Sequence, residues 1–445
     1  MIQIIVFALL LIFTFSFFGW NIYKVISNIS MGKSVDRSDR KSERLKTMLL
    51  VAFGQKKMFQ NLLPAVLHFF IYAAFVITST ELIEIIIDGL TGNHRFFAKP
   101  LGFFYVVVIS TIELLSVLAF IATIIFLARR NLLKVPRFHM DEMTGWPKLD
   151  GNIILYLEIL LIFCIFTMNG TDEVMLNHGW SHAHVDANSF GFAVSSYLGP
   201  LLFEGLDQST LEILERIGWW GHLIMVFGFL NYLPYSKHFH ILLAFPNTYY
   251  SNLNNKGQLT NLSNVKTEVE NMFDPNFDPY AAPIEGETLT EPERFGAKDI
   301  QDLTWKNLMD AYTCTECGRC SSACPANQTG KKLSPRKIMM DTRDRMVEVG
   351  ENKRKKGKDF DDGKSLLGDY ISEEELWACT SCNACVQQCP VNIDPLSIIV
   401  DLRRYLVMEE SKVPSELAGM LTNIENNGAP WQFSPTDRLN WANED

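Results

Sequence analysis

Eight of the nine cysteines in the sequence fall into two short stretches that share one spacing. The stretches "CTECGRCSSACP" and "CTSCNACVQQCP" both follow the pattern C-x2-C-x2-C-x3-C-P. Three cysteines at intervals of three residues can hold three corners of an iron–sulfur cube, while the fourth reaches a second cube. The spacing therefore predicts two [4Fe-4S] clusters with exchanged fourth ligands. The two ligand sets would be Cys314, Cys317, Cys320 and Cys389, and Cys379, Cys382, Cys385 and Cys324.

A pair of structural zinc sites is the alternative use of these cysteines. Zinc takes four thiolates in a tetrahedron, usually from two separated C-x2-C pairs. Two copies of a run of four cysteines closed by proline lack that arrangement, so the pattern favours iron–sulfur clusters.

Histidines in the apolar segment "WGHLIMVFGFLNYLPYSKHFHI" could bind a second metal group. His222 and His240 are 18 residues apart, so on a continuous helix they share one face, whereas His238 points elsewhere. A haem needs an axial ligand from each side, and His68 lies in another apolar run at a matching depth, about 10 Å inside the same membrane boundary. We therefore predict haem b between His68 and His240. Two unrelated buried histidines are the alternative, which the cost of polar groups in lipid disfavours.

A second haem is left open by the sequence. His222 is expected about 27 Å farther along the helix, where no histidine of the other apolar run stands opposite. A partner would have to come from an outer loop, where the histidines are His94, His178, His182 and His184.

Two acids, Glu113 and Glu158, also lie within apolar runs. Carboxylates are costly in lipid, and they either relay protons or bond to Ser, Thr or haem propionates. Quinone reduction consumes two electrons and two protons, and a haem together with such acids could supply both.

Five long apolar runs must position these side chains, namely residues 1–23, 61–90, 101–127, 152–168 and 213–246. Each approaches or exceeds the roughly 17–25 apolar residues that cross a bilayer. No basic residue precedes the first run and no small-residue cleavage site follows it, so we expect a retained membrane helix. Residues 190–206 contain Gly, Ser and Pro and fit a re-entrant or surface-lying segment.

Loop charges predict the orientation of these spans. Residues 24–57 contain nine Lys or Arg and residues 129–148 contain five, against two in residues 91–100 and none in residues 171–215. By the positive-inside rule, both basic loops and the C-terminus are cytoplasmic and the N-terminus is outside, in a bacterial inner membrane. The cysteines then lie in a reducing compartment, where they bind metal rather than form disulfides. No basic face is interleaved with aromatic residues, which excludes nucleic acid as a partner.

The predicted fold is therefore all-α and has four parts. Residues 1–246 form a five-helix transmembrane cytochrome b bundle, and residues 247–302 an extended polar linker. Residues 303–410 form a small, mainly helical ferredoxin-like 2×[4Fe-4S] domain, and residues 411–445 a C-terminal helix and docking tail. Trp431 and Trp441 suit the docking role, with a disordered tail as the alternative.

Two family resemblances add to these expectations. Residues 61–246 resemble the five-span, nitrate reductase gamma-like cytochrome b subunits, including the membrane subunit of heterodisulfide reductase. The resemblance implies haem ligands at His68 and His240 and a further ligand at His222. The family's fourth ligand falls on Thr78. Residues 303–445 resemble the iron–sulfur half of heterodisulfide reductase and of quinone-linked glycolate, lactate and glycerol-phosphate oxidoreductases, through "DAYTCTECGRCSSACP" and "LWACTSCNACVQQCP".

The sequence contains no cysteine-rich CCG module, no G-x-G-x-x-G fingerprint and no Ser/His/Asp arrangement. We therefore expect the substrate-converting site on a cytoplasmic partner subunit of the CCG or flavin type. The chain itself would be the quinone-reacting electron-transfer subunit of an oxidoreductase complex. The alternative is a membrane-bound iron–sulfur redox sensor or scaffold without turnover of its own.

Overall fold

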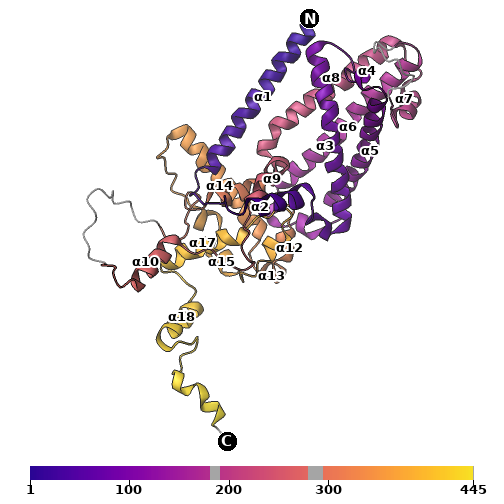
Figure 1. The fold of residues 1–445 in the computed structure, drawn as a ribbon. Helices are drawn as coiled ribbons and strands as arrows, with labels where there is room; N and C mark the ends of the chain where they lie inside the picture. Colours follow the sequence, from indigo (N-terminus) through magenta and orange to yellow (C-terminus); the bar gives the residue numbers. More distant parts are fainter. Residues whose placement is uncertain (181–190, 279–293, 444–445) are drawn as a thin grey trace.

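The computed structural model of the protein describes residues 1–180, 191–278 and 294–443 (Figure 1). Over these residues the chain is helical and contains no β-strand, only two isolated β-bridges. The all-α prediction is confirmed.

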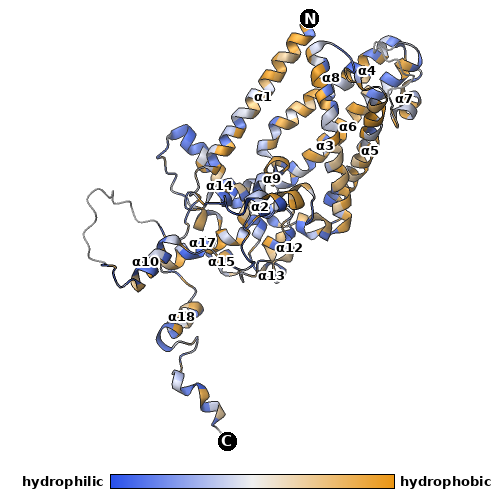
Figure 2. Ribbon diagram, in the orientation of Figure 1, coloured by the Kyte–Doolittle hydropathy of each residue, from blue (hydrophilic) through white to orange (hydrophobic). Residues whose placement is uncertain are grey.

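Within the described residues, five helices are long and apolar enough to cross a membrane: α1 (Ile2–Ile29), α3 (Leu62–Thr91), α5 (Phe103–Asn131), α6 (Trp146–Asn177) and α8 (Gln208–Tyr232). Their outer surfaces carry exposed apolar side chains such as Phe13, Phe104 and Ile224, and Figure 2 shows them mostly in the hydrophobic colours. In water this much exposed apolar surface would be unfavourable, whereas in lipid it is the expected surface. The chain is therefore a membrane protein.

Helix α6 extends beyond the predicted apolar run at both ends. Its last turns contain the buried polar residues Asn169, Thr171 and Asp172; Asn169 and Asp172 bond to neighbouring elements, and Thr171 bonds to carbonyls of α6 itself. The apolar run ends at Met168, but the helix continues because the hydrogen bonds of these polar groups are satisfied inside the bundle. Helix α6 packs on α8 and on α7 (Ser195–Phe203), and α3 packs on α5. The predicted surface-lying segment thus contains α7; its first residue, Phe190, lies outside the described residues.

The predicted continuous helix over residues 213–246 is wrong. Helix α8 ends at Tyr232, and two 3-10 turns follow, η5 (Leu233–Tyr235) and η6 (Lys237–Phe239), before α9 (His240–Tyr249) begins. Between the two turns Ser236 is extended, with φ −112° and ψ 149°. Pro234 has no N–H to donate and its ring crowds the preceding turn, so it interrupts the helix.

The cysteine-rich region consists of short helices around one apolar core. They are α11 (Trp305–Thr313), α12 (Arg319–Ala323), α13 (Pro325–Gln328), α14 (Pro335–Lys356), the π-turn η7 (Leu366–Tyr370), α15 (Glu373–Trp377), α16 (Ala384–Gln388) and α17 (Pro395–Met408). Leu308, Ile338 and Leu402 are fully buried in this core. Val25 of α1 and Phe239 of η6 belong to the same core, which is therefore continuous with one end of the membrane bundle.

Ala297 and Ile300 lie in the predicted extended linker, yet both are fully buried in this core. The linker also contains the helix α10 (Ser263–Phe273). Its residues 279–293 lie outside the described part of the chain.

Both basic loops lie at this end of the bundle. The first contains α2 (Lys41–Met48), the π-helix η1 (Leu49–Phe53) and η2 (Met58–Gln60), and the second η3 (Pro136–Phe138) and η4 (Asp141–Met143). At the end of α1, Asn28 donates a 2.7 Å hydrogen bond to the Tyr312 hydroxyl. From the second loop, Glu142 accepts a 2.8 Å bond from the fully buried Arg336. The short helix α4 (Ala98–Leu101) and α7 lie at the opposite end (Figure 1). Which end faces the cytoplasm stays a prediction.

The C-terminal residues extend away from the body of the molecule (Figure 1). They form α18 (Ser415–Asn427) and the 3-10 helix η8 (Pro435–Ala442). Trp431 and Trp441 are exposed there. Their docking role stays a prediction.

Candidate redox-cofactor sites

The two cysteine motifs meet where α12 packs against α16. Cys314, Cys317 and Cys320 of the first motif line one pocket together with Cys389 of the second. We call these four residues the first-motif set. In the second-motif set, Cys379 and Cys385 lie close enough to Cys324 for electrostatic interaction, and Cys379 also to Cys382. Cys389 thus lies with all three leading cysteines of the first motif, and Cys324 lies near Cys379 and Cys385 of the second.

The two cysteine loops have matching backbone conformations. Glu316 and Gly318 in the first loop have φ of 52° and 70°, and Ser381 and Asn383 at the equivalent positions have φ of 54° and 60°. Left-handed residues turn the chain tightly around the space that the sulfurs enclose, and they turn backbone N–H groups inward. One such bond joins Ser381 N–H to Cys379 Sγ at 3.4 Å. Bonds of this kind to sulfur set the reduction potential of an iron–sulfur cluster.

Burial makes these thiols poor acids in the absence of a cation. It raises the pKa of Cys314 to about 12 and the pKa of Cys389 to about 11. At neutral pH both would stay protonated, whereas a bound metal deprotonates a coordinating thiol. The donor set therefore fits a buried iron–sulfur cluster.

The prediction that His238 faces away from His240 is wrong. The two rings lie side by side, with centroids 5.4 Å apart, because the chain between α8 and α9 is not one helix. His68 is also within electrostatic range of both. Three imidazoles therefore gather at the end of the bundle that contacts the cysteine-rich region.

Hydrogen bonds distinguish His68 and His240 from His238. His68 Nδ1 lies 3.0 Å from Gln55 Oε1, and His240 Nδ1 lies 3.1 Å from the Lys237 carbonyl oxygen. An oxygen of this kind only accepts, so Nδ1 carries the proton and Nε2 has a free lone pair. Histidines that bind a metal commonly donate their other nitrogen in this way. His238 Nδ1 is buried without a partner in the described part of the chain. The residues present at His68 and His240 fit axial ligation of a haem.

His222 is buried in α8, and its Nδ1 has no hydrogen-bond partner among the described residues. Thr78, at the position of the family's fourth ligand, donates its hydroxyl to the Ala74 carbonyl at 2.8 Å. His178 stacks on Trp180. His182 and His184 lie outside the described residues. The second haem stays untested.

The two predicted intramembrane acids differ in their contacts. Glu113 is fully buried and accepts bonds from Asn169 Nδ2 (3.1 Å) and from the backbone N–H groups of Val194 (2.7 Å) and Ser195 (3.0 Å). It therefore satisfies the free N–H groups at the start of α7. Glu158 is half-buried in α6, and a proton-relay role for either acid stays a prediction.

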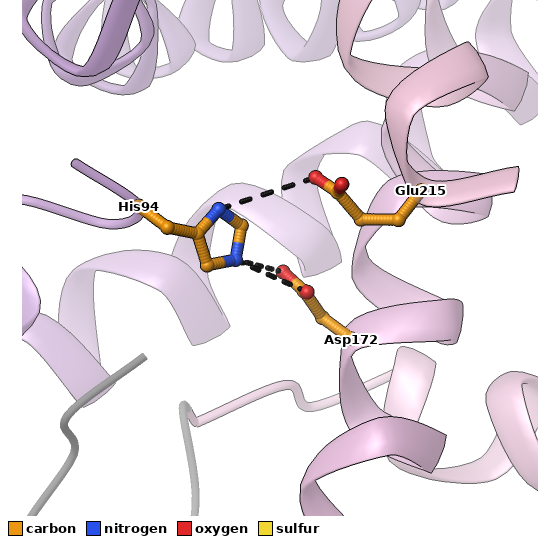
Figure 3. A group of neighbouring side chains, drawn as sticks. All are labelled: His94, Asp172 and Glu215. Carbon is orange, nitrogen blue, oxygen red and sulfur yellow. Dashed lines mark hydrogen bonds and ion pairs between the residues drawn. The ribbon is translucent and has the colours of Figure 1, made fainter. Parts of the chain in front are cut away.

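A buried polar group that sequence reasoning missed joins His94, Asp172 and Glu215 (Figure 3). His94 Nε2 lies 3.1 Å from both Asp172 carboxylate oxygens, and His94 Nδ1 lies 4.0 Å from Glu215 Oε1. Arg95 donates to Asp172 at 2.8 Å, and Arg216 pairs with Glu215. Because the guanidinium groups balance the two carboxylates, this arrangement favours a structural ion network over a cation site. Burial lowers the pKa of His94, but Asp172 outweighs it and the net shift is upward.

Comparison with known proteins assigns the cysteine-rich region. Residues 313–393 match the 4Fe-4S dicluster domain. The chain is homologous to iron–sulfur oxidoreductases. The predicted relationship to these proteins and to heterodisulfide reductase is confirmed, and so is the prediction of a 4Fe-4S domain.

Three relatives define the extent of this similarity. A probable iron-sulfur-binding oxidoreductase, FadF, from Bacillus subtilis (strain 168) is 28% identical over 94% of this chain and 58% of its own length. The EtfAB:quinone oxidoreductase of Syntrophomonas wolfei subsp. wolfei is 25% identical over 92% of this chain and 55% of its own length. One subunit of the ferredoxin/F(420)H(2)-dependent CoB-CoM heterodisulfide reductase from Methanosarcina acetivorans is 32% identical over 26% of this chain and 60% of its own length.

The chain thus spans a little over half the length of the two relatives that it matches almost throughout. No solved structure matches it significantly. The function that this similarity favours is therefore a proposal.

Proposed function

We propose that this protein carries electrons between a cytoplasmic redox partner and membrane quinone, through two [4Fe-4S] clusters and haem b. The first-motif and second-motif sets would hold the clusters, and His68 and His240 would ligate the haem. Bound there, the clusters and the haem supply one-electron carriers. The chain would be the quinone-reacting subunit of an oxidoreductase complex.

One observation carries this proposal: the cysteine motifs and three imidazoles occupy the same end of the bundle. The seam between them is polar and buried. Lys237, three residues before His240, pairs with Glu316 of the first cysteine loop, and Arg343 bonds the same carboxylate at 2.7 Å. Burying such charges is favourable only if the groups are held in a fixed arrangement. The seam therefore keeps the cluster ligands and the haem ligands at a constant separation, as electron transfer requires.

The two cysteine sets differ in exposure, which supports an order of transfer. Cys382 of the second-motif set is exposed, whereas Cys314 and Cys389 of the first-motif set are buried. A soluble partner can approach the second-motif set directly. Electrons would pass between the partner and the second-motif set, then the first-motif set, then the haem and quinone, in either direction.

The partner's chemistry follows from the relatives' names. One relative is an EtfAB:quinone oxidoreductase, which favours a flavin-containing partner over a CCG-type one. The substrate-converting chemistry would lie on that partner.

Reduced-minus-oxidised spectra of the purified protein, with iron and haem counted, test the proposal. We expect about eight non-haem irons per chain and at least one haem b that quinol or a quinone analogue can reduce or oxidise. Stoichiometric zinc with little iron would overturn the cluster assignment. Intact clusters without haem would leave an iron–sulfur sensor or scaffold as the better description.

A further inference from the structure

A short turn connects the haem ligand His68 to the cysteine motifs. Residues 55–57, which we call the 55–57 turn, follow the π-helix η1 and precede η2. Gln55 has φ +50° and is buried, and its carbonyl accepts a 2.8 Å bond from Met58 N–H. Left-handed backbone is costly for a residue with a Cβ and persists where the surroundings hold it, often at functional positions.

The side chain of Gln55 points to the haem end of the turn. Its Oε1 lies 3.0 Å from His68 Nδ1. Because the amide oxygen can only accept, this bond fixes the tautomer of His68 and aims Nε2 away from the turn.

Lys57 contacts both cysteine motifs. Its carbonyl oxygen accepts a 3.2 Å bond from Arg319, which lies between Cys317 and Cys320. Its ammonium donates a 3.3 Å bond to the carbonyl of Val386, next to Cys385. The ammonium is also close enough to the Cys389 sulfur for their charges to interact. Arg403 occupies a comparable position beside Cys379 of the second-motif set.

We propose that the 55–57 turn couples the haem to the first-motif cluster, with Gln55 as the positioning residue for His68 and Lys57 as one of the positive charges that raise the potential of that cluster. The proposal rests on the proposed function. The step served is the transfer of one electron: one group loses the electron that the other gains, and no proton or further reactant takes part. A positive charge stabilises the more negative, reduced form of a cluster and therefore raises its reduction potential.

Redox titration of the purified full-length protein, followed by low-temperature EPR, tests the role of Lys57. Lys57→Met should move the midpoint potential of the first-motif cluster to a more negative value and shift that of the second-motif cluster less. Lys57→Arg should keep most of the original potential. The neighbouring Lys56 is exposed, so Lys56→Met is a matched control that should shift neither cluster.

Equal shifts in the Lys57→Met and Lys56→Met proteins, or a shift confined to the second-motif cluster, would overturn the role of Lys57. If the Lys57→Met protein loses iron, Lys57→Gln replaces it in the comparison of midpoint potentials, because glutamine removes the charge but retains a donor to the Val386 carbonyl.

The reduction potential and the spectrum of the haem test the role of Gln55. Gln55→Leu removes the acceptor of the His68 proton, so the imidazole donates less electron density and the haem potential should rise. The exposed Gln60 provides the control Gln60→Leu. An unchanged haem spectrum and potential in Gln55→Leu would remove Gln55 from the proposal. A protein that binds no haem would instead refute the proposed function, while the Lys57 titration would still report on the cluster.

Discussion

The two cysteine loops share spacing and backbone conformation but differ in their surroundings. The first loop is buried: Glu316 meets Lys237 and Arg343, and Arg319 bonds to the 55–57 turn. At the position equivalent to Glu316, the second loop has Ser381, which is half-buried and forms no ion pair. The same ligand pattern thus appears in one copy shielded by the membrane bundle and in one copy open to solvent. The shared cysteine pattern predicts what each loop binds, whereas the residues between the cysteines differ and give each loop a different neighbour.

The largest effect is expected on removal of a cysteine that one motif supplies to the cluster of the other. Cys389→Ser should abolish the cluster of the first-motif set, because Cys389 belongs to that set although it is the fourth cysteine of the second motif. We expect loss of about four of about eight non-haem irons and of one EPR signal. Cys164→Ser, which changes the cysteine outside both motifs, should leave the iron content unchanged. Loss of the second-motif cluster instead would mean that each motif closes on itself.

The second test separates the haem from the clusters. His68→Ala and His240→Ala should each remove the haem and leave the iron–sulfur content intact, since both residues have an oriented Nε2. His238→Ala should retain the haem, because Nδ1 of His238 has no partner that orients the ring. Pyridine haemochrome spectra and iron counts give the comparison. If His238→Ala loses haem and His240→Ala keeps it, the ligand assignment must be exchanged.

The third test compares equivalent positions of the two loops. Glu316→Ala leaves the buried Lys237 and the half-buried Arg343 without their shared carboxylate. Because Asp150 and Asp344 remain beside them, the seam should lose up to about 3 kcal/mol, the lower end for a broken buried ion pair. Ser381→Ala introduces alanine at the same left-handed conformation but breaks no ion pair. The difference in stability between the two variants therefore measures the contribution of the ion pairs. Thermal loss of cluster absorbance in detergent measures it, and equal melting temperatures would contradict the buried-ion argument.

The smallest effect concerns the second left-handed position of each loop. Gly318→Ala should cost about 1–2 kcal/mol, the range for an L-residue in left-handed backbone. The new Cβ would also lie 2.5 Å from Arg336 Nη1, and Arg336 is held by Glu142. Asn383→Gly in the second loop should change stability by less than about 0.5 kcal/mol. Chemical denaturation followed by cluster absorbance distinguishes the two, and a larger loss for Asn383→Gly would reverse the order.

Features defined by local spacing could be predicted from the sequence. The cysteine repeat indicated the grouping of Cys389 with the first motif, and apolar run length indicated the five helices. The position of His238 could not be predicted. It depends on the extended residue Ser236, which separates the 3-10 turn that contains Pro234 from the 3-10 turn that contains His238. Gln55 could not be identified either, since its significance comes from a left-handed turn that brings it to a histidine 13 residues later. The His94–Asp172–Glu215 group required three elements to be placed together in space.

The junction at Asn28 bears on how the molecule is made. Asn28 bonds to Tyr312, 284 residues later, and Arg354 donates to Asn28 at 2.6 Å. Gly350 of α14 packs directly against the same asparagine side chain. Helix α1, which precedes that region by more than 270 residues, therefore carries part of the surface on which the cysteine-rich region closes. That region cannot complete its core until the membrane bundle is already in place, so cluster loading would be one of the last steps of biogenesis.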